Sequence, residues 1–263
     1  MLNKLLKYDL KYMIKNMTIF YMLSIFFAIT TRILFNIEQS VIINIVGQIS
    51  VGCMFAMITN ILINTMMRSW IRFRDSIYKD EAYLTHTLPV TKNDIYNSKF
   101  IQTLIFFIVS FLIILLTLFI AYFNKDRWFE LKNLISSITT GLEINTTLCI
   151  ISFIIIIFLE IYNAIQCGFL GIILGYKKNN NKIGFSVFFG LLAYILSQSI
   201  VLLVIYIVAL FNSSIMNLFT SNILLDTSSL KLLIILSIII YFMIIILMSI
   251  FCKKEFNKGV NIE

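Results

Sequence analysis

The sequence has one histidine, His86, and four cysteines, at positions 53, 149, 167 and 252. A structural or catalytic zinc site needs three or four His, Cys, Asp or Glu ligands, and the cysteines form no Cys-x-x-Cys pair. A catalytic triad would have to use His86, and no nucleophile-elbow motif lies near that residue. We therefore expect no catalytic residue and no metal site in this chain, which argues against an enzyme.

Glycine is also scarce, and none of the nine glycines is followed by a lysine. The phosphate-binding loop of many ATPases has the pattern Gly-x-x-x-x-Gly-Lys-Ser/Thr, in which backbone N–H groups and the lysine hold the phosphates. Because this pattern is missing, we expect no cofactor in the chain itself. If ATP powers the protein, a separate polypeptide must bind ATP and Mg²⁺.

Charged residues are few as well, at 13% of the 263 positions, whereas hydrophobic residues make up 60%. Soluble domains have about 25% charged and 45–50% apolar residues. A chain this apolar cannot bury its side chains in one aqueous core, so we predict an all-α polytopic integral membrane protein. Six apolar runs are long enough to span a bilayer as helices, and they define one transmembrane domain over residues 17–252: 17–37, 41–67, 101–123, 144–176, 183–211 and 230–252.

The basic residues predict the orientation of these spans. With six spans, one side of the membrane holds the N-terminus, the segments 68–100 and 177–182, and the tail 253–263. This side has all but five of the 21 lysines and arginines. The positive-inside rule therefore places both termini in the cytoplasm. The same topology explains the formal net charge of +8 better than nucleic-acid binding does.

The leader, residues 1–16, reads MLNKLLKYDLKYMIKN. On a helical wheel its four lysines fall within an arc of roughly 80°, with Leu2, Leu6 and Met13 on the opposite side. This pattern is typical of an amphipathic helix that lies in the membrane interface with its lysines toward lipid headgroups. A frayed terminus that only carries positive charge is the alternative.

Three segments do not fit a simple pattern of spans and loops. Residues 124–143 have apolar residues at helical spacing, as in a short amphipathic helix on the outer surface. Residues 212–229 are compatible with a re-entrant hairpin or with a plain loop. The run 144–176 would extend about 50 Å as a helix, so it must tilt, break or project, and its last glycines indicate close packing or a break.

Several polar residues lie inside the predicted spans, where such groups are costly. Asn60 and Asn64 are four residues apart in the second span, and Glu160, Asn163 and Gln166 share one broad face of the fourth. These faces either line a translocation path or form hydrogen bonds between helices within the bundle. Both interpretations remain open, and a buried carboxylate such as Glu160 is the hardest group to place structurally.

The longest polar segment, residues 68–100, follows the second span. Thr91-x-x-Asp94 fits a capping box, which predicts a helix that begins at Thr91 and continues into the third span. Pro89 disfavours helix at Leu88, and residues 79–86 have room for one or two helical turns. We therefore predict a helix, a break and a new helix, which together make a stiff cytoplasmic joint.

Part of this segment, YKDEAYLTHTLPVTKNDIYNSKF, resembles the segment after the second span in permeases of the bacterial type-2 ABC exporter family. Those permeases commonly have an acidic pair, a phrase such as YLTHTLPV or LTLPV, and a capped helix that leads into span three. The leader LLKYDLKYMIKN and the end of the fourth span with GYKKNNNKIG are also similar to that family. The likeness covers the whole topology, but the specific phrase covers only this short segment.

The resemblance implies a six-span subunit of the bacterial cytoplasmic membrane that pairs with a second copy or a similar chain. Each subunit would dock a separate cytoplasmic ATPase through a coupling helix, here from about Arg74 to Leu88, with a smaller contact around Lys177–Lys182. Exported peptides, other amphipathic compounds or lipids would all suit such a protein. For His86, an exposed loop residue with no special role is the favoured alternative. The residues implied as ATPase contacts are Arg74, Asp75, Tyr78, Asp80, Glu81, Tyr83, Leu84, His86 and Pro89.

A second class of function is a secondary transporter or channel that works without an ATPase. It would use Glu160 as a proton or cation site. The sequence has no detectable internal repeat of the kind that many secondary transporters contain, which counts against this alternative.

Overall fold

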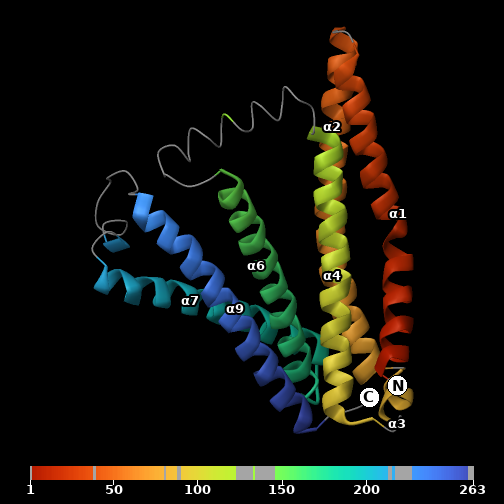
Figure 1. The fold of residues 1–263 in the computed structure, drawn as a ribbon. Helices are drawn as coiled ribbons and strands as arrows, with labels where there is room; N and C mark the ends of the chain where they lie inside the picture. The colour runs from red at the N-terminus through yellow and green to blue at the C-terminus, as the bar shows by residue number, and fades with distance from the viewer. Residues whose placement is uncertain are drawn as a thin grey trace. The chain divides into compact units, whose positions relative to one another are not determined.

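The computed structural model describes residues 2–37, 40–79, 81–87, 90–122, 133, 146–212, 215–216 and 227–259. Its helices form two compact units, Met1–Phe129 and Glu130–Glu263, which are considered separately below. The first unit contains α1 (Leu2–Asn36), α2 (Val41–Tyr78), α3 (Ala82–Thr87) and α4 (Lys92–Tyr122) (Figure 1). The second contains α6 (Thr146–Gly175), α7 (Lys182–Phe211) and α9 (Thr227–Asn257).

Six of these seven helices, all except α3, are long and apolar enough to cross a membrane. Only helices and closed barrels satisfy every backbone polar group inside hydrocarbon. The prediction of an all-α polytopic membrane protein with six spans is therefore confirmed. The helices are longer than most of the apolar runs because several of them continue into charged sequence: α2 ends at Tyr78 and α9 at Asn257.

The prediction of a separate interfacial helix over residues 1–16 is wrong. α1 runs without a break from Leu2 to Asn36, and this helix is itself one of the candidate spans. Asp9, Met13 and Met17, spaced four residues apart, form a face that is buried within the protein. The leader is amphipathic as predicted, but its apolar face packs against other helices. The described leader lysines are exposed: Lys7, Lys11 and Lys15.

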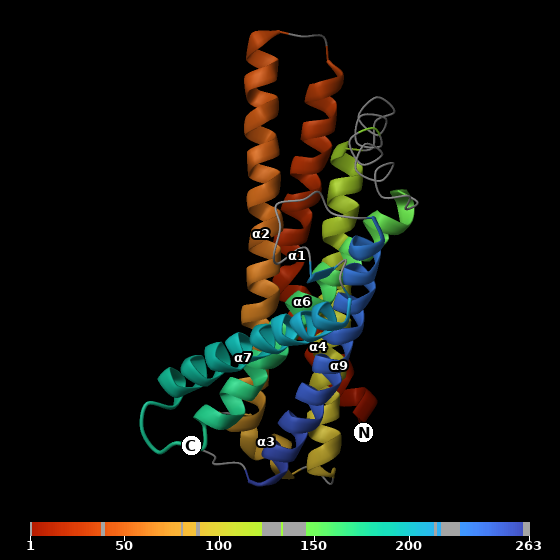
Figure 2. The ribbon, with the colours of Figure 1, turned by 90° about the vertical axis from the view of Figure 1, so that its left-hand side faces the viewer.

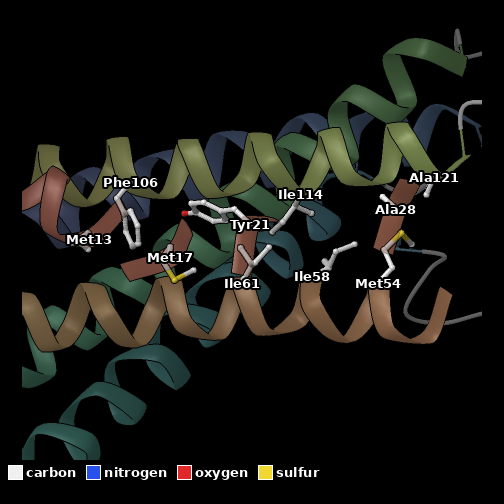
Figure 3. Packing of buried hydrophobic residues seen from close by; sticks show 10 residues of the cluster. All are labelled: Met13, Met17, Tyr21, Ala28, Met54, Ile58, Ile61, Phe106, Ile114 and Ala121. Atoms are coloured by element: carbon white, nitrogen blue, oxygen red, sulfur yellow. The ribbon is translucent and has the colours of Figure 1, made fainter. Parts of the chain in front are cut away.

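The core of the first unit lies where α1 packs against both α2 and α4. Ten buried residues from the three helices meet there (Figure 3): Met13, Met17, Tyr21, Ala28, Met54, Ile58, Ile61, Phe106, Ile114 and Ala121. Hydroxyl groups link the helices next to this core. Ser110 on α4 hydrogen-bonds Tyr21 of α1 at 2.6 Å and accepts from Thr65 of α2 at 3.0 Å. Such small polar pairs hold membrane helices together, since lipid tails are as apolar as the helix surfaces.

In the second unit, α6 packs against both α7 and α9, and α7 crosses α6 at an angle (Figure 2). Residues 176–181 join α6 to α7. Asn181 ends this turn with a left-handed backbone, φ 47°, and its side chain accepts a hydrogen bond from the Gly184 N–H at 3.3 Å. Asparagine tolerates this conformation better than most residues, and as an N-cap it satisfies one of the free N–H groups of α7.

The long fourth span is one unbroken helix of 30 residues, α6. Of the two outcomes expected for its glycines, close packing is the one found. A Cβ atom at Gly171 would collide with the backbone of Ser186 and Gly190, and one at Gly175 would collide with Ser186. Glycine at these positions lets the backbones of α6 and α7 approach directly, as in other close-packed membrane helices.

The segments 124–143 and 212–229, for which a surface helix and a hairpin or loop are predicted, lie almost entirely outside the described residues. The domain and tail boundaries at residues 17, 252 and 253 remain predictions.

The close approach of α6 and α7 gives a test in Gly175→Val. The new side chain would collide with the backbone and the side-chain hydroxyl of Ser186. Overpacking of this kind costs about 1–3 kcal/mol. Gly52→Val is the matched control, because a Cβ at Gly52, also inside a span helix, meets no atom within 4 Å. We expect the Gly175 variant, but not the Gly52 variant, to lower the denaturation midpoint in detergent, and equal effects would contradict this packing.

Candidate functional site

The joint between α2 and α4 consists of residues 79–91 and contains the short helix α3. α3 spans Ala82–Thr87, whereas the coupling helix was predicted from about Arg74 to Leu88. Arg74, Asp75 and Tyr78 instead belong to the last turns of α2. The joint is thus shorter than the polar segment 68–100, because α2 and α4 extend into it from both sides.

Of the capping box predicted at the start of α4, the half in which the Thr91 side chain caps the helix is confirmed, while the Asp94 carboxylate bonds the Thr91 hydroxyl and not its backbone N–H. The N–H of Asp94 donates to the Thr91 hydroxyl oxygen at 3.2 Å, and that hydroxyl donates to the Asp94 carboxylate at 2.6 Å. α4 begins at Lys92, directly after the cap. This arrangement satisfies an N–H group that the helix itself leaves unpaired, so the start of α4 is fixed in position.

Glu81 attaches α3 to the rest of the first unit. Its backbone carbonyl accepts hydrogen bonds from the N–H and the hydroxyl of Thr85, at 2.9 and 3.0 Å. Its carboxylate accepts from the Nη1 atom of Arg72 at 2.6 Å. One residue therefore holds the first turn of α3 and ties it to α2.

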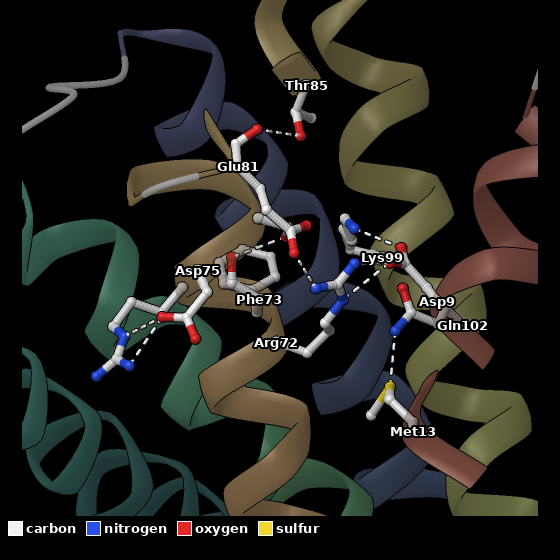
Figure 4. A network of polar contacts seen from close by, with 11 residues as sticks. Asp9, Met13, Arg72, Phe73, Asp75, Glu81, Thr85, Lys99 and Gln102 are labelled. Carbon is white, nitrogen blue, oxygen red and sulfur yellow. Dashed lines mark hydrogen bonds and ion pairs between the residues drawn. The ribbon is translucent and has the colours of Figure 1, made fainter. Parts of the chain in front are cut away.

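Arg72 is the centre of a network of four charges (Figure 4). Besides Glu81, it binds Asp9 of α1, with its Nε atom 2.8 Å from Oδ1 of that carboxylate. The other oxygen of Asp9 accepts from Nζ of Lys99, on α4, at 2.5 Å. The Arg72 guanidinium also lies 5.0 Å from the centre of the Tyr12 ring, within the range of a cation–π interaction.

This charge network is electrically balanced, and its Asp9–Lys99 part is buried, whereas the Glu81 side chain is 45% exposed. Asp9 is 1% exposed and Lys99 is 2% exposed, so water screens their interaction little. Two cations face two anions, and the four residues come from α1, α2, α4 and the entry to α3. A buried charge that loses its partner costs about 3–5 kcal/mol, so Asp9, Arg72 and Lys99 hold α1, α2 and α4 in one arrangement. The more exposed Glu81–Arg72 pair adds a weaker link to the entry of α3.

The tip of α3 carries the exposed side chains of the joint. Tyr83 is 64% exposed and Leu84 is 73% exposed, while Tyr78 is buried at the end of α2. Arg74 is occupied by its neighbour Asp75, with 2.8 Å between the guanidinium and the carboxylate. The remaining predicted contacts, Asp80, Pro89 and the side chain of His86, lie outside the described residues.

Asn60 and Asn64 form a pair within α2. The side-chain amide of Asn64 donates to the backbone carbonyl of Asn60 at 3.0 Å, and it also bonds the Asn60 side chain. Both residues are half-buried. This bond runs along one helix, so it satisfies amide groups locally at membrane depth.

The polar residues of the fourth span have different environments in the second unit. Asn163 is fully buried and donates to the Ser197 hydroxyl on α7 at 3.0 Å. Gln166 is also buried, yet neither polar atom of its amide has a hydrogen-bond partner in the described part of the chain. Glu160 is half-buried at the middle of α6, near Tyr194 of α7 and Tyr241 of α9.

Glu160 also has no ion-pair partner among the described residues, in contrast to Asp9. An acidic side chain at the centre of a membrane helix costs about 2.5–3.5 kcal/mol on insertion scales. Such a group is commonly functional, because an apolar residue of similar size at the same position would avoid this cost.

At the C-terminal end of α6, Glu255 of α9 connects the turn of residues 176–181 to the end of α9. Its carboxylate accepts from Lys177 at 2.6 Å and from Lys258 at 2.5 Å. The predicted second contact, around Lys177–Lys182, is thus a turn fixed to the last helix. Its lysines otherwise give this end of the unit a positive charge suited to anionic lipid headgroups.

A scan of protein-family models and searches of curated proteins and solved structures found no match to this chain. The described residues contain no group of three or more His, Cys, Asp or Glu side chains that would hold a metal ion. The fold and these sites define a polytopic α-helical membrane protein whose described residues include a balanced charge network around Arg72 and a mid-span carboxylate, Glu160, without an ion-pair partner among them.

Sequence reasoning missed Asp9, Arg72 and Lys99 as a group. A signal for Asp9 does exist, because it stands four residues before Met13 and eight before Met17, on the face opposite the leader lysines. An acidic residue in that register indicates a buried partner of opposite charge.

The charge network gives a stability test in Asp9→Asn. We expect this variant to lose about 3–5 kcal/mol of unfolding free energy, because Lys99 and Arg72 keep buried charges without their shared carboxylate. Asp75→Asn is the matched control, since its pair with Arg74 is more exposed and such pairs contribute about 0–1 kcal/mol. The measurement is reversible unfolding in mixed micelles.

A double variant separates lost charge balance from lost packing. Asp9→Asn with Lys99→Gln leaves Arg72 and Glu81 as a balanced pair, so it should recover part of the stability lost in the single variant. A double variant that is less stable than Asp9→Asn would show that charge balance is not what the network provides.

Proposed function

We propose that this chain is the membrane-spanning permease subunit of an ATP-binding-cassette exporter of the type-2 family. It exports an amphipathic compound, such as a peptide, with energy from ATP. ATP and Mg²⁺ bind to a separate cytoplasmic ATPase subunit, and this chain has no catalytic role. A second copy, or a similar chain, completes the transporter in a bacterial cytoplasmic membrane, with both termini in the cytoplasm.

The observation that carries this proposal is the construction of α3. A partner that closes on ATP moves the spans of a permease only through an element that is both exposed and stiffly connected to them. Tyr83 and Leu84 supply exposed apolar surface, of the kind that protein interfaces bury. Glu81 connects the same turn to Arg72, and thus to Asp9 and Lys99.

The network also defines a route for the movement. A displacement of α3 acts on α2 through the Glu81–Arg72 pair, on α1 through Asp9, and on α4 through Lys99. The N-cap formed by Thr91 fixes the start of α4 at the other end of the joint. The four segments therefore move together, as is required of a coupling element that transmits a displacement to the first unit.

The ATPase contact is tested by alanine substitution at the tip. We expect Tyr83→Ala and Leu84→Ala each to weaken association with the cytoplasmic ATPase subunit proposed above by about tenfold or more, as for central interface residues. Tyr8→Ala is the control, because Tyr8 is also strongly exposed, at 74%, but lies on α1. Affinity is measured between the ATPase and the chain in nanodiscs.

Two results would reject the exporter function. One is wild-type chain that binds no ATPase under conditions in which both proteins are folded. The other is transport by both tip variants at the wild-type rate.

Glu160 supports one alternative, a secondary transporter or channel in which this carboxylate takes up a proton or cation. Its position at mid-span without an ion-pair partner among the described residues favours such a role. In that case the chain works without an ATPase.

The two functions differ in what the purified chain does alone. We expect proteoliposomes that contain only this chain to show no proton or sodium flux above that of empty liposomes, because the exporter needs its ATPase. Flux is measured with an internal pH dye and with ²²Na⁺. Flux that is lost in Glu160→Gln but kept in Glu255→Gln would reject the exporter function and support the secondary transporter or channel.

A further inference from the structure

The end of the second unit at which α6 and α9 terminate has a large excess of positive charge. Residues 177–182 and 253–258 contain six lysines and one acidic residue, Glu255. The Glu255 carboxylate accepts from Lys177 at 2.6 Å and from Lys258 at 2.5 Å, so two cations already share its single negative charge. Another lysine lies over an aromatic ring, with the Nζ atom of Lys182 5.8 Å from the centre of the Tyr176 ring. The lysines that have no ion-pair partner among the described residues are Lys178, Lys182, Lys253 and Lys254.

The contact between Lys177 and Glu255 brings these two lysine-rich segments together. In the turn after α6, the N–H groups of Lys177 and Lys178 each donate to the carbonyl three residues earlier, at 3.3 and 3.0 Å, so the backbone of the turn is fixed. Lys178 follows directly after the turn residue that binds α9, and Lys254 directly precedes the residue of α9 that is bound. Positive charges from two segments distant in sequence are therefore held close to one contact.

Lys254 also lies at the end of an exposed apolar face of α9. Met243, Leu247 and Ile250 precede it at successive spacings of four, three and four residues, which places all four side chains on one side of the helix. Lys254 is exposed, and each of the three apolar side chains is more than half exposed. Because α9 is a candidate span, this face meets acyl chains, and the ammonium at its end lies at the level of the headgroups. One phospholipid molecule therefore matches both the apolar face and the lysines.

We propose that the turn after α6 and the end of α9 form a binding site for an anionic phospholipid. Its phosphate pairs with Lys178, Lys253 and Lys254, and one acyl chain lies along the exposed apolar face of α9. A zwitterionic headgroup brings its own cation to these lysines, so the site selects an anionic headgroup over phosphatidylcholine. This inference goes beyond the proposed export function and does not depend on it, because the site lies in the second unit and α3 lies in the first.

Native mass spectrometry of the full chain in detergent micelles tests the site, because each bound lipid adds its own mass. The probes are dioleoyl-phosphatidylglycerol and dioleoyl-phosphatidylcholine, which have the same acyl chains and differ in headgroup charge. Glycerol 3-phosphate, a phosphate ester without acyl chains, is the soluble competitor. The site variant is the triple substitution Lys178→Gln, Lys253→Gln and Lys254→Gln. The matched control is Lys7→Gln, Lys11→Gln and Lys15→Gln, which removes the same number of charges from exposed positions of α1.

We expect the wild-type chain to bind phosphatidylglycerol more tightly than phosphatidylcholine by about tenfold or more, since each lysine near a membrane surface contributes a factor of about five. The site variant should bind the two lipids about equally, whereas the α1 control should keep the wild-type preference. Excess glycerol 3-phosphate should leave most of the phosphatidylglycerol bound, because it cannot replace the acyl chain. If the half-buried Lys253 is needed for folding, the double variant Lys178→Gln with Lys254→Gln should also lower the preference.

An equal loss of preference in both triple variants would show that net charge alone attracts the lipid, and would overturn a defined site. Wild-type chain without any preference would overturn it too, and so would complete displacement by glycerol 3-phosphate, which would assign the lysines to a soluble phosphate ester. A site variant that keeps its lipid preference but loses affinity for the ATPase subunit would assign this surface to the ATPase. Conversely, a chain that binds the lipid with this preference but binds no ATPase disproves only the export function.

Discussion

A polar group inside hydrocarbon has no water to bind, and this constraint decides most of the structure. It requires helices for every span, because only a helix satisfies its own backbone. It explains why the hydroxyls of Tyr21, Thr65 and Ser110 meet one another, and why the amide of Asn64 folds back onto Asn60. It also makes any charge at membrane depth an informative exception.

Two of the described carboxylates, Asp9 and Glu160, differ in how their charge is met. Asp9 is surrounded by Arg72 and Lys99, so its charge is neutralised within the protein and its role is to fix the arrangement of helices. Glu160 has tyrosines of α7 and α9 near it and no ion-pair partner among the described residues, so no cation of that part of the chain balances it.

The sequence predicts those features that depend on neighbouring residues. Apolar runs locate the spans, the Thr91–Asp94 spacing locates the start of α4, and the glycines of α6 indicate close packing or a break, of which the structure has the first. It does not predict that α2 continues to Tyr78, because charged residues end an apolar run but not a helix. Nor does it reveal that Asp9 joins Arg72 and Lys99, 63 and 90 residues away, since such pairing leaves no local pattern.

The long separation of Asp9 and Lys99 has a consequence for biosynthesis. Ribosomes add about 5–20 residues per second, so roughly 5–20 s separate the synthesis of the two residues, which are 90 positions apart. During that interval α1 is already made, but the charge it must bury has no complete set of partners. The complete set of partners of Asp9 is therefore available only after the start of α4 has been made.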